Sequence, residues 1–336
     1  MKSMLCVMTV FLFSVALVAQ DHSQATNSLF DVSEAKVFNP GKILVQGEVQ
    51  EPGMVDLSQL PLHNAPVKEL ALENGKQTFK GAYFISGYAL CDILNKKQAK
   101  KSPENTFKPL VDMYVIVENS KGEKAVFSWG EIFHRDSYHI LIAKTIQPVN
   151  PARLKTSWPL PAESRLISAD DLLNVRFISN PAKITVKSYH GNAAPETVKD
   201  IYSPEIRITT LTGSAVIRDI GSAIEKRHYD SVLYGHGMGF KEVLSFSGYL
   251  FKDVIAAHVK ITADNLKSAI FVISAKDGYR SVFSISEIMN RNDNQDILLR
   301  DVKDSPSEGR YTLVITDFFA DRDVRVIDKI EMLTAD

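Results

Sequence analysis

Apolar residues recur at helical spacing in two places, each time directly after a Ser-Gly-Tyr sequence. The positions are Leu90, Ile93 and Leu94 in the first place, and Phe251, Val254 and Ile255 in the second. Apolar residues three and four positions apart form one face of an α-helix. The pattern therefore predicts a short helix, packed on a core, after each Ser-Gly-Tyr sequence.

A β-hairpin is predicted after each of these helices. Apolar runs at 114–117 and 270–273 lead into the turn sequences Ser120-Lys121-Gly122 and Lys276-Asp277-Gly278. A Gly-containing turn between two apolar runs is typical of a hairpin. Each return strand ends in a Phe-Ser pair, and a Glu follows three positions after the Ser.

These Ser and Glu residues predict the start of a second short helix. Ser128 is followed by Glu131, and Ser284 is followed by Glu287. At this spacing the two side chains form a capping box, in which they satisfy the first free backbone donors of a helix.

Four segments of the chain have similar counterparts later, in the same order. The pairs are 79–88 with 240–249, 126–132 with 282–288, 140–142 with 297–299, and 175–178 with 324–327. Ordered internal similarity indicates a repeated unit. Because helix, hairpin, short helix and strands follow one another, the unit is predicted to be α+β. We expect a first copy at 40–187 and a second copy at 205–336.

The remaining segments are predicted to be a linker and an arm. The linker at 188–204 contains Gly191-Asn192-Ala193-Ala194-Pro195 and has no periodic pattern. Residues 20–39 are interpreted as an N-terminal arm.

The first 19 residues have the pattern of a cleaved signal peptide. Lys2 precedes an almost wholly apolar run from Met4 to Ala19, and polar sequence begins at Gln20. We expect cleavage after Ala19 and export to the periplasm or the extracellular space, without a membrane span. Removal of this segment leaves Cys91 as the single cysteine, so an internal disulfide is excluded.

Charge and motif content exclude several function classes. The 39 Lys and Arg residues are balanced by 40 Asp and Glu residues, whereas nucleic-acid binding requires a basic surplus or stripe. The chain also has no Gly-x-Ser-x-Gly nucleophile motif and no phosphate-binding loop. We therefore expect no nucleic-acid partner and no hydrolase triad of the α/β type.

A set of short motifs in a fixed order carries a resemblance to a known family. The motifs are the strand Val45–Val49 with its Pro52-Gly53 turn, Leu60-Pro61, the hairpin Lys276-Asp277-Gly278-Tyr279 with Phe283-Ser284, and the late pairs Asp170 with Arg176 and Asp317 with Arg325. In this order they resemble the molybdopterin-binding domain of the sulfite oxidase group. The resemblance covers most of both copies. It implies an oxidoreductase fold that holds a molybdenum–pterin cofactor through a Cys thiolate.

The cysteine that the resemblance implies is absent. It should lie in the segment before the Ser-Gly-Tyr helix, and neither 67–78 nor 231–239 contains a Cys. A soft thiolate is the ligand that this metal prefers. Cys91 lies inside the predicted helix, where the second copy has Lys252, so we do not assign it to a metal.

By the family's spacing, His236 lies nearest to the place of the missing Cys. Gly235 and Gly237 flank it, and glycine lets the backbone approach a ligand closely. An accessible imidazole binds metals or anions. Gly235, His236 and Gly237 are therefore the candidate cofactor-binding residues, and His236 is the candidate metal ligand. A glycine-rich turn with a solvent-facing His is the alternative.

Three functions remain open at this point. The first is a secreted, non-catalytic binding or assembly protein that needs no cofactor, with a protein or a small ligand as its partner. The second is a molybdopterin-dependent oxidoreductase with an atypical ligand set. The third is a simple metal or small-anion site at 235–239. The late Asp–Arg pairs, in which Asp170-Asp171 and Asp317 precede an Arg, are interpreted as structural clamps, with a catalytic role as the alternative.

Overall fold

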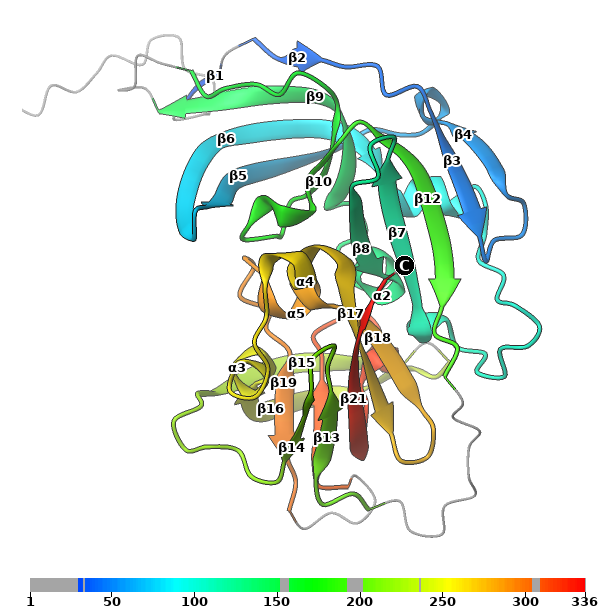
Figure 1. The fold of residues 1–336 in the computed structure, drawn as a ribbon, viewed down its shortest axis with the longest axis vertical. Coiled ribbons are helices and arrows are strands. Elements are labelled where there is room, and N and C mark those ends of the chain that lie inside the picture. The colour runs from blue at the N-terminus through cyan, green and yellow to red at the C-terminus, as the bar shows by residue number, and fades with distance from the viewer. Residues whose placement is uncertain are drawn as a thin grey trace, which may run out of the picture.

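The structure, a computed structural model, describes residues 30–32, 34–151, 157–191, 202–235, 237–303 and 309–335. They form four β-sheets around a common centre, as in a four-bladed β-propeller (Figure 1). The predicted α+β class, with two sulfite-oxidase-like copies, is wrong because the described chain is mostly β. Its α-helices have only five or six residues each. Apolar spacing predicted where helices lie, but one and a half turns are enough to satisfy that spacing.

Two sheets belong to the first half of the chain, defined here as the described residues up to 191. One has the order β4-β3-β12-β7-β8, formed by Gly53–Asp56, Lys42–Gly47, Pro181–Ser188, Met113–Asn119 and Lys124–Ser128. The other has the order β11-β10-β9-β6-β5, formed by Ile178–Ser179, Arg165–Ser168, Ile140–Pro151, Lys76–Ala89 and His63–Glu73. β1 (Phe30–Val32) and β2 (Lys36–Val37) pair with β9.

Two sheets belong to the second half, defined as the described residues from 202 onward. One has the order β14-β13-β21-β17-β18, formed by Ser214–Ile217, Ile206–Thr209, Ile327–Thr334, Ala269–Ala275 and Arg280–Ser284. The other has the order β15-β16-β19-β20, formed by Lys226–Gly235, Gly239–Leu250, Leu298–Asp301 and Tyr311–Val314. β13 pairs in parallel with β21, as β3 does with β12.

The five described α-helices are short, and four of them begin where the local sequence predicts. They are α1 (Leu90–Asn95), α2 (Trp129–Phe133), α3 (Phe251–Ala256), α4 (Ala263–Ser268) and α5 (Ile285–Met289), with 3-10 turns η1 (Leu57–Gln59), η2 (Leu110–Asp112), η3 (Asn174–Arg176) and η4 (Ala320–Arg322). The two predicted capping boxes, at the start of α2 and of α5, are confirmed. The predicted apolar faces of α1 and α3 are buried.

Each half places one buried arginine at its junction with the other half, and the group around each arginine is called a centre below. Arg176 donates to Asp171 at 2.8 Å and to Glu131 at 2.6 Å. Ser284, which caps α5 in the other half, donates to the same Glu131 at 2.9 Å and accepts from Arg176 at 3.2 Å. The predicted Asp–Arg clamp is present, and Asp171 of the pair Asp170-Asp171 supplies its carboxylate.

Arg322 repeats this arrangement in the second half. It forms ion pairs with Asp317 at 2.6 Å and with Glu287 at 2.5 Å. Ser128, the cap of α2, donates to Glu287 at 2.6 Å and accepts from Arg322 at 3.1 Å. The predicted partner Arg325 is therefore replaced by Arg322. Each half thus holds its central carboxylate with a serine of the other half.

Both arginines are closed to solvent, with 0% of their surface exposed. Burial alone would raise the pKa of Glu131, but the Arg176 guanidinium overcomes this and holds that pKa below its usual range. Burial raises the pKa of Glu287, and Arg322 offsets this only in part. These groups cannot meet a substrate, so they serve the junction between the halves.

Several sequence predictions fall largely on residues outside the described ranges. The predicted signal peptide at 1–19 lies wholly outside them, as does 192–201 of the predicted linker. The described part of the predicted arm forms β1 and β2. Cleavage, export and the domain boundaries stay predictions. Among the described residues, no helix has the length and apolar character needed to cross a bilayer.

Candidate binding surface

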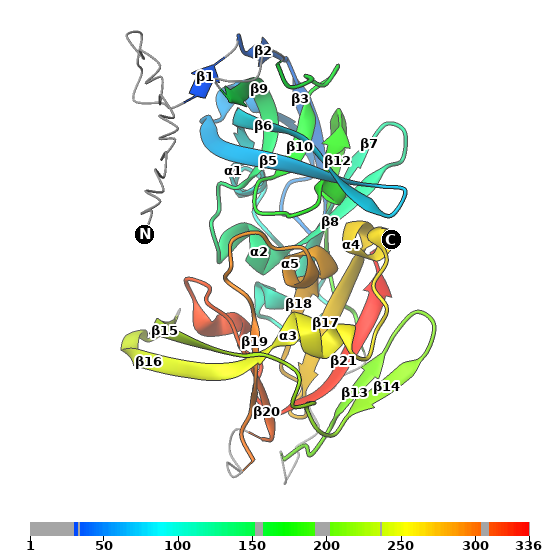
Figure 2. The same ribbon diagram turned by 90° about the vertical axis from the view of Figure 1, so that its left-hand side faces the viewer.

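The predicted Gly235-His236-Gly237 site falls at the tip of the hairpin formed by β15 and β16. Gly235 ends β15 and Gly237 lies in the turn, whereas His236 is outside the described residues. A Cβ atom added at Gly237 would have no neighbour within 4 Å, and Met238 beside it is 79% exposed. The hairpin extends from the body as an arm (Figure 2). The described residues of this tip therefore do not enclose a ligand.

The two strands of this hairpin pair along their whole length, which fixes the direction of their side chains. Val232 lies opposite Val243, and Tyr234 lies opposite Phe240. Between these pairs, Lys241 is an extra residue that forms a β-bulge. Opposite residues in an antiparallel ladder point to the same face, and residues two apart on a strand do so as well. All four side chains therefore share one face of the hairpin.

This face is apolar and open to solvent. Its residues, together with the neighbouring Phe318, have exposed fractions of 57% (Val232), 38% (Tyr234), 63% (Phe240), 65% (Val243) and 67% (Phe318). The Tyr234 and Phe318 rings lie 5.7 Å apart. We call these five residues the apolar face. Adjacent large apolar side chains with such exposure mark an interaction site more often than single ones do.

An aromatic contact anchors the apolar face to the first half of the chain. The ring of Phe318 packs edge-on against the ring of Phe319, with 4.8 Å between their centroids. The centroid of the Phe319 ring lies 5.7 Å from that of the His134 ring. The backbone N–H of Phe318 also donates to the carbonyl of His134 at 2.7 Å. The base of the apolar face is thus fixed, while its outer part lies on the projecting β15–β16 hairpin.

The edge of β16 next to this face lacks a strand neighbour over much of its described length. β16 pairs with β19 only at Tyr249 and Leu250. In the first half, β6 pairs with β9 from Tyr83 to Ala89. The segment Leu244–Gly248 of β16 corresponds to the paired part of β6. An unpaired edge presents free backbone donors and acceptors to another chain.

The sequence prediction placed its candidate residues, Gly235, His236 and Gly237, at the tip of this hairpin, and that assignment stays a prediction. It did not identify the apolar face on the two strands. The available signal was a difference between the repeated segments: the pair Val232 and Val243 occupies the place that Lys68 and Ala82 take in the first half. The two hairpins can be aligned because Lys80 and Lys241 are the bulged residues of each.

The described residues do not fit the molybdenum–pterin cofactor that the resemblance implies. The thiol of Cys91 is buried and donates to the carbonyl of Ser137 at 2.8 Å. Burial raises the pKa of this thiol to about 12, so it is not a thiolate at neutral pH. Within the described ranges, no three His, Cys, Asp or Glu side chains are grouped so that they could hold a metal ion.

Comparison with known proteins gives a distant structural likeness and no match in sequence. No protein-family model matches the chain, and no curated protein does. Among solved structures, the chain is similar to the sulfane dehydrogenase SoxCD from Paracoccus pantotrophus, with 10% sequence identity and a TM-score of 0.32. The match covers 86% of this chain and 78% of that chain. At this level the likeness carries no argument about activity.

Proposed function

We propose that this chain is a non-catalytic binding protein whose partner is an extended polypeptide segment. The segment packs on the apolar face of the β15–β16 hairpin and pairs with the free edge of β16. The observation that carries this proposal is the exposure of four large apolar side chains on one side of one hairpin, together with the neighbouring Phe318. Strand addition of this kind combines backbone hydrogen bonds with side-chain contacts on one face.

The first half of the chain supports the choice of a strand as the partner. There, β9 pairs antiparallel with β6, which is the hairpin strand that corresponds to β16. The same fold thus covers this edge with an extended segment where its own chain supplies one. In the second half, the described part of β19 is too short to do so.

Non-catalytic function is supported by the state of the reactive groups. Cys91 is a buried, protonated thiol, and both central arginines are held in buried ion pairs. The molybdenum-enzyme alternative predicts stoichiometric molybdenum and releasable pterin in protein from a cofactor-producing host. Elemental analysis and pterin fluorescence would detect both, and we expect neither.

Binding of labelled peptides tests the proposal directly. A peptide of about ten residues that alternates Val and Thr has the length and pattern of a strand for this edge. We expect it to bind at micromolar to millimolar concentration by fluorescence anisotropy, and a Ser/Thr peptide to bind at least about tenfold more weakly, a difference of about 1.4 kcal/mol. The variant V232K/V243A carries the residues of the first-half hairpin and should lose this preference.

Two controls separate the parts of the proposal. Val37→Lys changes a side chain of similar exposure (65%) outside the face and should leave binding unchanged. N-methylation of alternate residues keeps the peptide's side chains and removes backbone donors. Equal binding of the methylated peptide would remove strand pairing from the proposal. Equal binding by V232K/V243A would remove the apolar face.

A further inference from the structure

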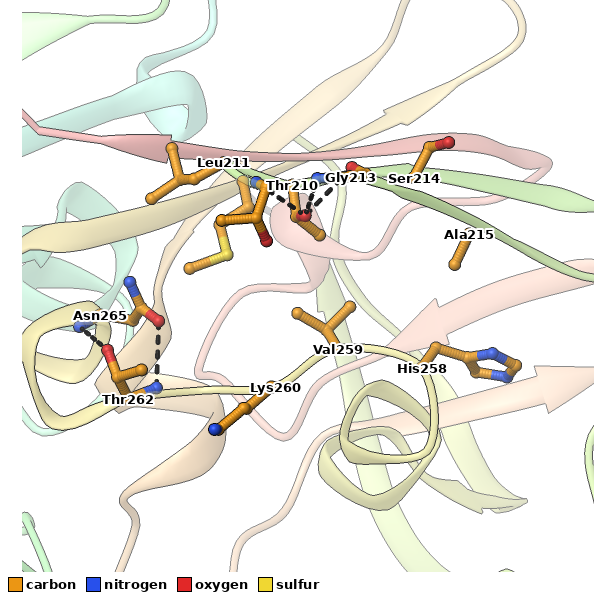
Figure 3. A pocket seen from close by; sticks show the side chains of 12 residues that line it. Thr210, Leu211, Gly213, Ser214, Ala215, His258, Val259, Lys260, Thr262 and Asn265 are labelled. Atoms are coloured by element: carbon orange, nitrogen blue, oxygen red, sulfur yellow. Dashed lines mark hydrogen bonds between the residues drawn. The ribbon is translucent and has the colours of Figure 1, made fainter.

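A pocket of about 410 Å³ lies in the second half, on the side of the β14-β13-β21-β17-β18 sheet. It separates the turn between β13 and β14 from the connection between α3 and α4. Figure 3 shows these two segments on opposite sides of the pocket. Met332 of β21 contributes to its lining. The volume is in the range of small-molecule sites.

The corresponding place in the first half is closed by backbone hydrogen bonds. The turn between β3 and β4 is joined to the segment after α1: Gln50 N–H donates to the carbonyl of Gln98 at 2.9 Å, and Lys100 N–H donates to that of Glu48 at 2.9 Å. Val49 and Ala99 form a β-bridge between the same two segments. No room for a ligand is left between them.

In the second half, the turn satisfies its own polar groups instead. Thr210 N–H donates to the carbonyl of Gly213 at 2.8 Å, and the Thr210 hydroxyl accepts from Gly213 N–H at 3.0 Å. Across the pocket, Thr262 and Asn265 bond to each other's backbone N–H in a capping box. Each of the two segments that line the pocket therefore forms these hydrogen bonds within itself. The space between the walls is a feature of the native fold and does not depend on a missing bond.

The lining residues give the pocket a positive charge and a mixed surface. Lys260 carries a positive charge, His258 adds an imidazole ring, and the lining contains no Asp or Glu. Thr212 and Ser214 add hydroxyl groups from the turn side. Val259 and Met332 are buried apolar residues with 6% and 4% exposure. A matching ligand has an anionic group, hydroxyl groups and an apolar patch.

We infer that this pocket binds a small polyhydroxylated carboxylate of the sugar-acid class. Lys260 pairs with the carboxylate, the threonine and serine hydroxyls meet ligand hydroxyls, and the C–H face of the sugar ring lies toward Val259 and Met332. This site is separate from the apolar face, so neither proposal depends on the other.

Titration calorimetry with D-glucuronate and D-glucose provides the test, because the two probes differ in the carboxylate. We expect glucuronate to bind with a Kd near ~1 mM and glucose to bind at least about fivefold more weakly. Glucuronate should also shift the methyl resonance of Met332, which can be assigned with Met332→Leu. Lys260→Gln should weaken glucuronate about fivefold, whereas Lys267→Gln, on α4 but not in the lining, should not.

Three results would overturn the inference in whole or in part. No heat and no Met332 shift at about 20 mM glucuronate, well above a millimolar Kd, would exclude this ligand class. Equal affinity for glucose and glucuronate would exclude the charge recognition by Lys260. Equal weakening by Lys260→Gln and Lys267→Gln would show that binding occurs outside the pocket.

Discussion

The two halves of this chain have similar buried centres and differ at their edges. Each centre has a buried arginine, two carboxylates and a serine from the other half. At the edges, the first half covers its hairpin with β9 and closes the turn between β3 and β4 onto the chain after α1. The second half leaves an open strand edge and an open pocket at the corresponding places. A buried charge that loses its partner destabilises the fold strongly. The open strand edge and the pocket therefore lie at the periphery, away from the buried ion pairs.

The largest expected effect comes from removing one central arginine. Arg322→Met leaves Glu287 and Asp317 buried without their cationic partner, which should cost about 3–5 kcal/mol of unfolding free energy. Urea denaturation measures this loss. Arg176→Met should cost a similar amount if the centres are equivalent. Arg207→Met, at an exposed ion pair, should cost less than about 1 kcal/mol. Unequal losses at Arg176 and Arg322 would show that the two centres are not equivalent.

A pH-dependent difference is expected at Asp323. The residue after η4 is the half-buried Asp323, whereas the residue after η3 is Phe177. Burial raises the pKa of Asp323 to about 7, in spite of the hydrogen bond from Ile315 N–H. Asp317, Arg322 and Arg325 are the charged groups near it.

The folded state therefore holds a proton that the unfolded chain releases near pH 4. The stability contributed by this group is present at low pH and is lost as the pH rises to about 7. Asp323→Asn should be about as stable as the parent at pH 4 and more stable at pH 8, by on the order of 2–4 kcal/mol. Thermal unfolding at both pH values measures this, and a constant difference would contradict it.

A smaller effect is expected where the two centres are not identical. Gly130 of α2 occupies the position that Ser286 has in α5. A Cβ atom at Gly130 would lie 2.2 Å from Cδ and Nε of the buried Arg322. Gly130→Ala should therefore cost about 2 kcal/mol through overpacking. Gly213→Ala, where an added Cβ has no neighbour within 4 Å, is the matched control. Equal melting temperatures of the two variants would show that Arg322 has room to move.

The smallest expected effect concerns the two strand edges. Amide hydrogen exchange in 244–248 of β16 should be at least about tenfold faster than in 83–87 of β6, a difference of about 1.4 kcal/mol. Only β6 has a second strand neighbour there among the described residues. Mass spectrometry of the corresponding peptides resolves the two segments. Equal protection that disappears on dilution would mean that copies of the chain cover the edge.

Short-range features could be predicted from the sequence. The capping boxes and both hairpin turns depend on residues within a few positions of one another, and they are confirmed. The fold class was wrong because strand length is not local: β5 and β6 extend far beyond their apolar cores, with 11 and 14 residues. The substitution of Val232 and Val243 for Lys68 and Ala82 was a sequence signal for the apolar face, but the exposure of this face depends on how far β9 and β19 extend beside it, which the local sequence does not specify.

Ser128 and Ser284, which each bond to a glutamate of the other half, affect how this chain folds during synthesis. Glu131 receives hydrogen bonds from Arg176 in its own half and from Ser284 in the other, so the centre of the first half stays incomplete until residue 284 has left the ribosome. Glu287 of the second half likewise receives a hydrogen bond from Ser128 of the first half. Domains usually fold one after another during synthesis. Here we expect the two centres to form together, and each half to be less stable when it is produced alone.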